Sequence, residues 1–397
     1  MSPSALPSDW KTATLLGRAW LPGARGGPTP ITVRGDGTVM DLGRTAPTAS
    51  AWLERDELAG ALRSAGGSPV GRIEDLLANS RSDFDPARAR LLAPCDLQAI
   101  KAAGVTFVAS TLERVIEEQA RGDASRAEAI RARLQGILGN DLASVRPGSD
   151  QAARIKQALV EQGAWSQYLE VGIGPDAEIF TKTQPMAAVG HGALIGVHPR
   201  SSWNNPEPEI VLAVDSRGRI RGATLGNDVN LRDFEGRSAL LLGKAKDNNA
   251  SCAIGPLIRV FDDGFALDDV RSCEITLDVH GAEGFHLRGT SSMTRISRDP
   301  EDLVAQAIGG NHQYPDGFML FLGTMFAPVE DRGAAGMGFT HKSGDRVVIA
   351  AERLGALENE VTTSDRAPPW TFGTGALMRN LAARGLLGPT PDARDGR

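Results

Sequence analysis

The sequence predicts an α+β protein, with a small N-terminal α+β region ahead of a larger and mainly antiparallel β domain. Near the N-terminus, residues 30–43 read as a strand, a Gly-Asp-Gly turn and a second strand, and helical segments follow at 51–65 and 72–78. From Glu178 onward, short runs of Val, Ile and Leu alternate with Gly, Asp and Pro. Many short strands with few helices between them favour antiparallel sheets over a doubly wound βαβ sheet.

A domain boundary is expected near residues 94–98, after the helical segments of the first region and the run 86–92 that leads out of it. We expect a small domain over residues 1–97 and a larger domain over residues 98–397. A total of 397 residues with 41% apolar content is enough for one large core and a smaller one.

A helical stretch is expected at the start of the second domain. Ser110 with Glu113, and Ser125 with Glu128, have the spacing of capping boxes ahead of apolar runs. A third helix is expected over residues 151–162. These helices should form an insert at the edge of the domain.

Charge and cysteine content limit the classes of partner. The formal net charge is -6, from 43 Lys and Arg against 49 Asp and Glu, whereas phosphate binding requires a basic excess, so no nucleic-acid partner is expected. Cys95, Cys252 and Cys273 are widely spaced and show no zinc-binding pattern, which favours a reducing compartment. With no secretory leader or spanning segment in this sequence, we expect a cytoplasmic protein with no membrane partner.

Three carboxylates are predicted to meet on one sheet face. Glu207 and Glu209 are two residues apart at a strand entrance, so their side chains share a face. The segment 215–221 reads as a turn with Arg-Gly at its tip, and a two-residue loop there gives pairing partners whose numbers sum to 435. That register sets Asp228 directly opposite Glu207, at about 5 Å between Cβ atoms.

Carboxylates held so close together repel one another, and a divalent cation removes the conflict. An all-oxygen ligand set without His or Cys favours Mg²⁺ first, then Mn²⁺ or Ca²⁺. Three protein ligands leave open positions for water and substrate. The alternative is a solvated, charged strand face with no ligand.

Four sequence runs, in their order and spacing, resemble the fumarylacetoacetate hydrolase family. They are PEPEIVLAV, then GNDVNLRD with its Asp nineteen residues after Glu209, then KDNNASCAIGP, then LFLGT. The likeness covers roughly residues 180–360 and implies a mixed β-roll catalytic domain. It also implies that Glu207, Glu209 and Asp228 hold the metal.

The same resemblance assigns roles to residues outside the acidic cluster. It implies that Lys246 is catalytic, while Lys244 close by is expected to face solvent. Gly323 and Thr324 match the turn whose amide and hydroxyl contact the substrate carboxylate. Lys182 is left with two readings, a site lysine or a structural ion pair.

The segment 104–118 points to one branch of the family. Hydrolases of the family carry a fourth acid and a catalytic His here, whereas this chain has Thr106 and no His. The helix motif S-x-x-x-R-x-x-E (Ser110, Arg114 and Glu117) and the run HPRSSWNNPEPE resemble instead the dehydratases of 2-keto-3-deoxy-D-xylonate and 2-keto-3-deoxy-D-arabinonate.

The resemblance therefore implies Mg²⁺-dependent dehydration of a 2-keto-3-deoxy sugar acid to 2-oxoglutarate semialdehyde in pentose catabolism. The metal polarises the keto oxygen and Lys246 adds positive charge, which together stabilise an enolate. Glu117 is the predicted acid/base, against the alternative of a solvent-facing glutamate. Arg114, His198 and Ser202 are expected to bind the substrate.

Other aromatic and imidazole side chains have less specific readings. His191 and Trp203 are placed to line the pocket or to be structural, and His312 and His341 are expected to be structural.

Two other functions stay open at this point. A hydrolase that cleaves a C–C bond of a 2,4-diketo acid would need a group that activates water, and His198 could serve. A non-catalytic sugar-acid sensor would require a lost ligand, and none is lost. The resemblance also implies a homodimer or homotetramer, with residues 367–387 as a tail over the same subunit or a neighbour.

Overall fold

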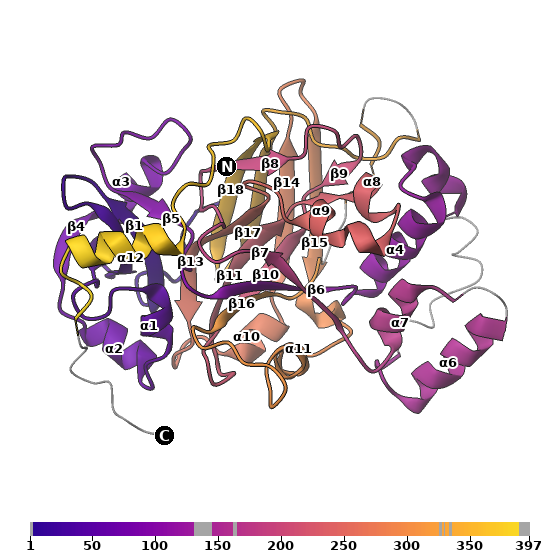
Figure 1. Cartoon of the computed structure of the whole chain (residues 1–397), viewed down its shortest axis with the longest axis horizontal. Helices are drawn as coiled ribbons and strands as arrows, with labels where there is room; N and C mark the ends of the chain where they lie inside the picture. The colour runs from indigo at the N-terminus through magenta and orange to yellow at the C-terminus, as the bar shows by residue number, and fades with distance from the viewer. Residues whose placement is uncertain are drawn as a thin grey trace.

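The computed structural model describes residues 3–130, 145–161, 165–324, 328, 330–332 and 336–388. Within them the chain forms two large β-sheets with further elements at both ends (Figure 1). One end carries the N-terminal strands and α12 (Thr374–Ala383), and the other carries α4 (Val108–Ala120), α6 (Asp150–Glu161) and α7 (Gln167–Ile173). The predicted α+β class is confirmed.

The larger sheet has eleven strands. Their order is β4 (Ser68–Arg72), β3 (Thr38–Asp41), β2 (Gly27–Val33), β1 (Leu15–Leu21), β13 (Cys252–Val260), β11 (Ile220–Asp228), β10 (Pro208–Val214), β16 (Phe318–Phe321), β6 (Ala99–Gly104) and β7 (Glu178–Thr183), with β5 (Arg90–Leu92) also paired to β1. Neighbours are antiparallel except β16 and β6. The hairpin predicted at 30–43 is present as β2 and β3.

The second sheet has five strands. Their order is β15 (His286–Ser292), β14 (Glu274–His280), β17 (Arg346–Ala351), β18 (Gly355–Thr363) and β8 (Leu194–Val197). Buried apolar side chains from both sheets, including Leu212, Leu225, Leu277 and Ile349, form one core cluster. A short ribbon of β9 (Asn204–Asn205) and β12 (Asn230–Leu231) extends the β10–β11 hairpin.

Short helices fill the connections. Those near the sheets are α1 (Ala49–Leu53), α2 (Leu58–Ser64), α3 (Ile73–Ala78), α8 (Arg232–Glu235), α9 (Leu242–Lys246), α10 (Leu267–Arg271) and α11 (Pro300–Ala307). The helix predicted at 72–78 is confirmed as α3. The helix predicted at 51–65 is two helices instead, because Thr48 caps the first and the chain turns at residues 54–57 before the second.

The two predicted capping boxes are wrong. α4 begins at Val108, directly after Phe107 bridges to Ile296, so Ser110 lies inside the helix. Asp123, rather than Ser125, caps the next turn, and its carboxylate accepts the N–H of Ser125 at 3.1 Å. Most of the helix expected after Ser125 falls outside the described residues, whereas the third predicted helix is present as α6.

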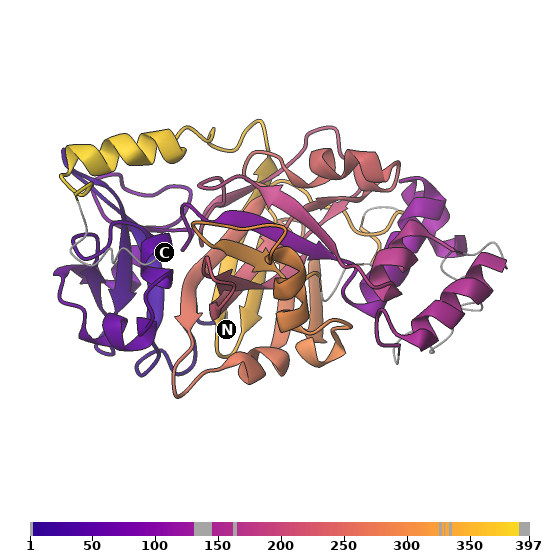
Figure 2. The ribbon, with the colours of Figure 1, turned by 60° about the horizontal axis from the view of Figure 1, so that its bottom comes forward.

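The C-terminal segment lies over the same chain. The side chain of Asn380 in α12 donates to the carbonyl of Gly26 at 2.8 Å, and Arg384 donates to that of Pro28 at 2.7 Å. Figure 2 shows α12 running along the N-terminal strands. Because β1 pairs with β13, the N-terminal strands continue the main sheet, and the division at residue 97 stays a prediction.

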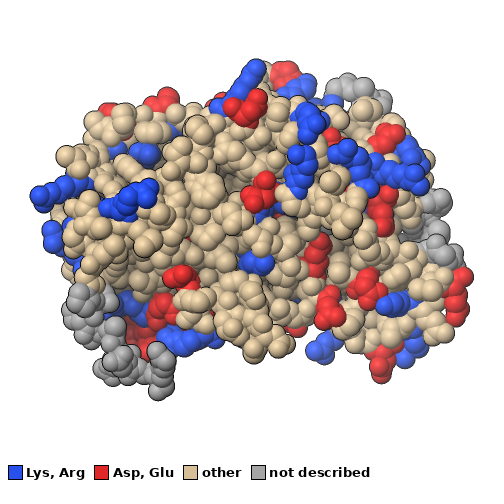
Figure 3. Space-filling view, viewed as in Figure 1, with Lys and Arg blue, Asp and Glu red and all other residues tan. Residues whose placement is uncertain are grey.

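Charged side chains of both signs share the surface. On the face in Figure 3, Lys and Arg gather over α8 and α9, with Asp and Glu among them. No helix in the described part of the chain is long and apolar enough to cross a membrane.

Candidate metal centre

The register of β10 and β11 brings the predicted metal ligands together. The residue numbers of paired residues along the two strands sum to 435, as the sequence predicts. The N–H of Asp228 donates to the carbonyl of Glu207 at 3.0 Å. The turn itself differs from the prediction. The N–H of Asp215 donates to the carbonyl of Arg219, which leaves residues 216–218 as a three-residue tip. A bulge between Ala213 and Val214 restores the predicted register in the rest of the hairpin.

Glu207, Glu209 and Asp228 form a buried cluster. Each is at most 2% exposed, and one carboxylate oxygen from each lies within 4.8 Å of the others. The alternative of a solvated strand face is therefore wrong. Buried carboxylates at this spacing require a cation, and the oxygen-only donors fit a hard divalent ion such as Mg²⁺.

Two buried lysines neutralise part of the cluster. The Nζ of Lys246 lies 3.0 Å from Asp228 Oδ2 and also contacts Glu207, and the Nζ of Lys182 lies 2.8 Å from Asp228 Oδ1. Burial disfavours the charged form of Lys246, but Asp228 and Glu207 outweigh burial and raise the pKa of its amine. Lys182 thus forms the ion pair that its structural reading expects, and its role in the reaction stays a prediction.

Glu209 is the member of the cluster that has no counter-charge in contact. It accepts the N–H of Gly323 at 2.7 Å, and among the described residues no Lys or Arg forms an ion pair with it. Burial, followed by Asp228 and Glu207, raises the pKa of Glu209 well above its usual value. A divalent cation at the cluster would supply the missing charge, and this deficit is the strongest sign that the residues fit a metal.

A network on α4 and α8 supports the cluster from one side. The Nη2 of Arg114 lies 2.5 Å from Glu207, and its Nη1 lies 2.7 Å from both Glu117 and Glu235. Arg232 Nε lies 2.6 Å from the other oxygen of Glu117. Glu117 is 2% exposed, so the solvent-facing alternative for this residue is wrong.

The two arginines set the protonation of Glu117. Burial opposes ionisation, but Arg114 and Arg232 outweigh burial and hold the pKa of Glu117 below its usual value. The contacts of Arg114 described above are all with protein carboxylates, so its role in substrate binding stays a prediction.

Sequence reasoning missed two acids near the cluster. Burial raises the pKa of Glu235 to about 7, against the pull of Arg114 and Lys246. Burial also raises the pKa of Glu178 at the start of β7, where Arg114 and Lys246 oppose the shift and Glu207 adds to it. Glu235 lies seven residues after Asp228 and two residues after the end of the run GNDVNLRD, a spacing that could have marked it. Glu178 carries no local signal, because only the pairing of β7 with β6 brings it near.

Gly323 and Thr324 follow β16 at the edge of the cluster. Gly323 has a φ of +96°, and a Cβ there would lie 2.0 Å from Thr106 Oγ1, so only glycine fits. Its amide is already engaged by Glu209. Thr324 is 6% exposed. Their contact with a substrate carboxylate stays a prediction.

His198 and Ser202 lie in the loop between β8 and β9. The ring of His198 packs on Phe234 at 5.2 Å and accepts the N–H of Arg200. Ser202 is exposed, and its N–H donates to Asp233 at 2.9 Å. These contacts tie both residues to α8 rather than to the acids, and their substrate-binding roles stay predictions.

Two other histidines have structural contacts. His191 Nδ1 accepts the N–H of Glu358 at 3.2 Å, and burial lowers the pKa of its ring. His341 is buried, with Nδ1 3.2 Å from Asp345, which also pairs with Arg332. The structural reading of His341 agrees with these contacts.

Asp345→Asn is expected to lower the free energy of unfolding at pH 7 by about 2 kcal/mol, taking about 1.4 kcal/mol per pKa unit. Burial opposes ionisation of Asp345, but His341 and Arg332 lower its pKa to about 2 from 3.8. The stabilisation is therefore present above pH 4 and is lost as pH falls toward 2. Urea unfolding of both proteins between pH 2 and 7 measures this stabilisation. An equal loss of unfolding free energy in Asp345→Asn at pH 2 and at pH 7 would refute this account.

A second group of metal-type side chains lies on the β14–β15 hairpin. Ligand atoms of Asp278, His280 and His286 also lie within 4.8 Å of one another. The two imidazole rings are stacked face to face at 4.5 Å, however, and His286 Nε2 is 3.0 Å from Asp278. Stacked rings direct their nitrogens along parallel planes rather than toward a common ion, so the oxygen cluster is the better metal site.

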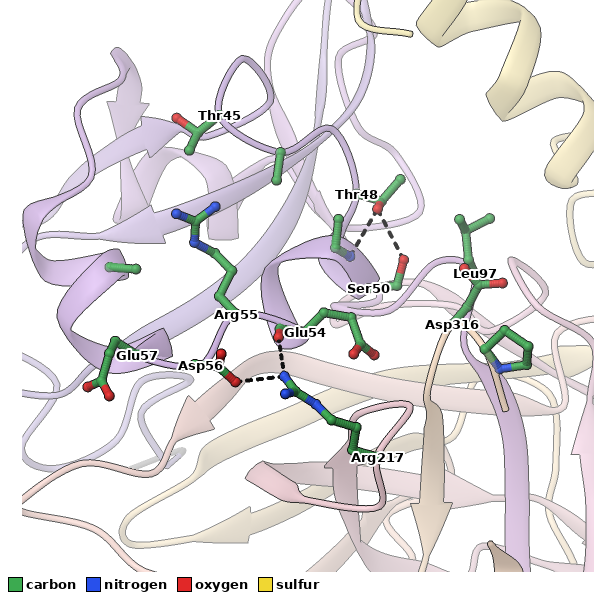
Figure 4. A pocket seen from close by; sticks show the side chains of 14 residues that line it. Thr45, Thr48, Ser50, Glu54, Arg55, Asp56, Glu57, Leu97, Arg217 and Asp316 are labelled. Carbon is green, nitrogen blue, oxygen red and sulfur yellow. Dashed lines mark hydrogen bonds and ion pairs between the residues drawn. The ribbon is translucent and has the colours of Figure 1, made fainter. Parts of the chain in front are cut away.

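A cavity of about 910 Å³ between α1, α2 and the β10–β11 turn is not the reaction centre (Figure 4). Both oxygens of Glu54 accept hydrogen bonds from Ser216 at 2.7 Å, and Asp56 pairs with Arg217 at 2.7 Å. Glu54 and Asp56 are therefore already satisfied, and the three predicted metal ligands do not line the cavity.

Sequence comparison connects this site to known proteins. Residues 156–362 match the family described as "Fumarylacetoacetate (FAA) hydrolase C-terminal". The chain is 34% identical over 180 residues to 2-dehydro-3-deoxy-D-arabinonate dehydratase of Saccharolobus solfataricus, which covers 45% of this chain and 57% of the relative. It is 30% identical over 209 residues to the probable 2-keto-3-deoxyxylonate dehydratase of Haloferax volcanii, which covers 52% and 68%.

Structural comparison gives the same fold. The apo form of a 2-keto-3-deoxy-D-arabinonate dehydratase matches with a TM-score of 0.61 and 23% identity, over 88% of this chain and 99% of that one. Its complex with magnesium and 2,5-dioxopentanoate matches with a TM-score of 0.60 at the same identity and coverage. The family match spans the acidic cluster, Lys246 and Gly323-Thr324 together. The chain therefore belongs to the fumarylacetoacetate hydrolase family.

Proposed function

We propose that this protein is a Mg²⁺-dependent hydro-lyase that dehydrates 2-keto-3-deoxy-D-xylonate or 2-keto-3-deoxy-D-arabinonate to 2-oxoglutarate semialdehyde, in pentose catabolism. The observation that carries the proposal is the buried trio of Glu207, Glu209 and Asp228 with Lys246 in contact. Both relatives that match in sequence are named as dehydratases of such acids. Bound Mg²⁺ would be held by the trio and would act as a Lewis acid toward the keto oxygen.

The chain supplies the remaining chemistry. Lys246 lies in a site from which water is largely excluded, so its charge stabilises an enolate oxygen strongly. A base removes a proton from C3 and the C4 hydroxyl leaves as water after it takes up a proton, which gives a C3–C4 double bond. Loss of a proton from C5 and uptake of one at C3 then give a C4–C5 enol, and this enol takes up a proton at C4 and loses its hydroxyl proton to give the aldehyde. Exposed Lys244 and the other Lys and Arg side chains over α8 and α9 would attract the anionic substrate (Figure 3).

Glu117 is proposed as the acid/base. Its pKa, held low by Arg114 and Arg232, keeps it ionised at neutral pH and able to accept a proton. Glu178, whose pKa is raised by burial, is the better candidate to give a proton to the leaving hydroxyl.

Glu117→Gln is expected to lower kcat by about 10²–10⁴-fold, because acid/base groups contribute on this scale. Mg²⁺ affinity should change little. Glu118→Gln is the matched control, since the Glu118 carboxylate is bound by Gln167 and Ser166 instead of the two arginines. Steady-state kinetics over pH 5–9 measure the effect. Near-normal turnover in Glu117→Gln, with turnover lost in Glu178→Gln, would transfer the role.

Product analysis by NMR tests the function itself. The Mg²⁺-loaded protein is mixed with each of the two epimeric 2-keto-3-deoxy acids, and the semialdehyde should appear and be lost on chelation. Cleavage of a 2,4-diketo acid, with neither sugar acid consumed, would move the protein to the hydrolase alternative. In that case a group such as His198 would have to activate water.

The cellular setting completes the proposal. We infer that the enzyme acts in the cytoplasm as a homodimer or homotetramer. Cys95 and Cys252 are buried and unpaired, and Cys273 is unpaired, which fits a reducing compartment. Mn²⁺ or Ca²⁺ could replace Mg²⁺ at an oxygen-only site.

A further inference from the structure

The sheet face that carries the metal ligands continues into a pair of buried asparagines. β9 and β12 pair Asn205 with Asn230, and these numbers again sum to 435. The register of the metal ligands is therefore unbroken. Since side chains alternate along a strand, Asn205 shares the face of Glu207, and Asn230 shares the face of Asp228.

These amides are buried, and three of their four polar atoms have no partner within the described residues; the fourth, the Nδ2 of Asn205, donates to the carbonyl of Pro206 at 2.9 Å. Asn205 is 1% exposed and Asn230 is 0% exposed. Within the described residues, the Oδ1 of Asn205 and both polar atoms of Asn230 have no hydrogen-bond partner, and neither does the indole Nε1 of buried Trp203. Buried polar groups are rarely left unpaired, because each costs the desolvation of a donor or acceptor.

A network from α4 contacts the residues that flank this pair along the chain. Arg114 contacts Glu207, and Arg232 lies over the ring of Trp203 at 4.9 Å. Glu117 joins the two arginines. Along the chain, Asn205 lies between Trp203 and Glu207, and Asn230 lies between Asp228 and Arg232. Trp203 and Arg232 also line a cavity of about 210 Å³.

We propose that Asn205, Asn230 and the indole N–H of Trp203 bind the hydroxyl end of the substrate, while its 2-keto acid end lies at the acidic cluster. The unpaired atoms comprise two donors and two acceptors, and a hydroxyl group both donates and accepts. Residues two apart on a strand are spaced by about 7 Å, which is comparable with the length of a five-carbon acid. This inference rests on the proposed function, because it names the part of that substrate which is recognised.

The test uses two acids that differ by one hydroxyl. Neither 5-hydroxy-2-oxopentanoate nor 2-oxopentanoate has a C4 hydroxyl to lose, so binding can be measured without turnover. Calorimetry on the Mg²⁺-loaded protein should give the hydroxylated acid at least about a tenfold lower Kd, since a site built to bond a hydroxyl discriminates against its absence. Asn230→Leu, which keeps the volume, should remove this preference and leave the Kd of 2-oxopentanoate within about twofold.

Two further variants complete the design. Trp203→Phe keeps the ring and removes its N–H, so it should reduce the preference even if Asn230→Leu does not fold. Asn311→Leu, at an exposed loop position, is the matched control and should keep the preference. The inference is overturned if the wild-type protein shows no preference for the hydroxylated acid, or if Asn230→Leu raises the Kd of both acids by the same factor. A preference for the hydroxylated acid that depends on Asn230 supports the inference even when the NMR experiment finds no dehydration. Failure of this inference and failure of the proposed function are therefore distinguishable.

Discussion

Glu209→Gln should abolish Mg²⁺ binding and lower kcat/KM by on the order of 10³-fold or more, because the loss of one major electrostatic stabiliser alone costs 10²–10³-fold. Gln keeps the shape of the side chain and one oxygen but removes the negative charge. The same change should not destabilise the metal-free protein at neutral pH. Glu209 has a raised pKa and no counter-ion in contact, so Gln reproduces the protonated form that burial already favours.

Unfolding in urea with and without Mg²⁺ separates these effects. In the wild-type protein, Mg²⁺ at 100 times its Kd should add about 2.7 kcal/mol of stability by mass action. This increment should vanish in Glu209→Gln and remain in Glu360→Gln, which alters an exposed glutamate on β18. An unchanged Mg²⁺ increment in Glu209→Gln would remove this residue from the ligand set.

Lys246→Met should lower the free energy of unfolding of the metal-free protein by about 3–5 kcal/mol, the usual cost of leaving buried charges without a partner. Lys246 is 2% exposed and contacts both Glu207 and Asp228. Turnover should fall by about 10²–10³-fold as well, because the charge beside the developing enolate is lost.

Added Mg²⁺ should restore much of the stability of Lys246→Met but not its turnover. The reason is that a divalent ion neutralises Glu207 and Asp228 without replacing the amine that faces the substrate. Lys11→Met, at an exposed position of the N-terminal region, is the matched control and should be close to wild type in both measurements. Recovery of turnover with Mg²⁺ would show that Lys246 serves only to neutralise the acids.

The sequence was sufficient for the metal ligands because their geometry is local. Glu207 and Asp228 are close in the chain and one hairpin joins them. The alternation of side chains and the pairing register of that hairpin therefore place them opposite each other. The predicted turn was one residue too short, and a bulge compensated. The family resemblance also led to Lys246, which lies at the cluster as a catalytic lysine would.

The surroundings of the ligands were beyond local reasoning. Glu117 comes from a helix whose start the capping pattern misplaced, and its two arginine partners lie on α4 and α8. Lys182 reaches Asp228 from β7, the last strand in the sheet order, whereas Asp228 lies on β11 in its middle. Sequence spacing carries no information on such contacts, because they depend on how distant strands pair and how the helices pack.

The sequence by itself therefore determined the α+β class and the acidic trio, since both follow from short-range periodicity, and its oxygen-only ligand chemistry predicts a hard cation. Only the tertiary structure decided which charges oppose the trio and left Glu209 without a counter-ion in contact. It also decided that the Oδ1 of Asn205 and both polar side-chain atoms of Asn230 are buried without hydrogen-bond partners among the described residues. Burial and the pairing of distant segments set these properties, because desolvation depends on everything packed around a group and not on its neighbours in the chain.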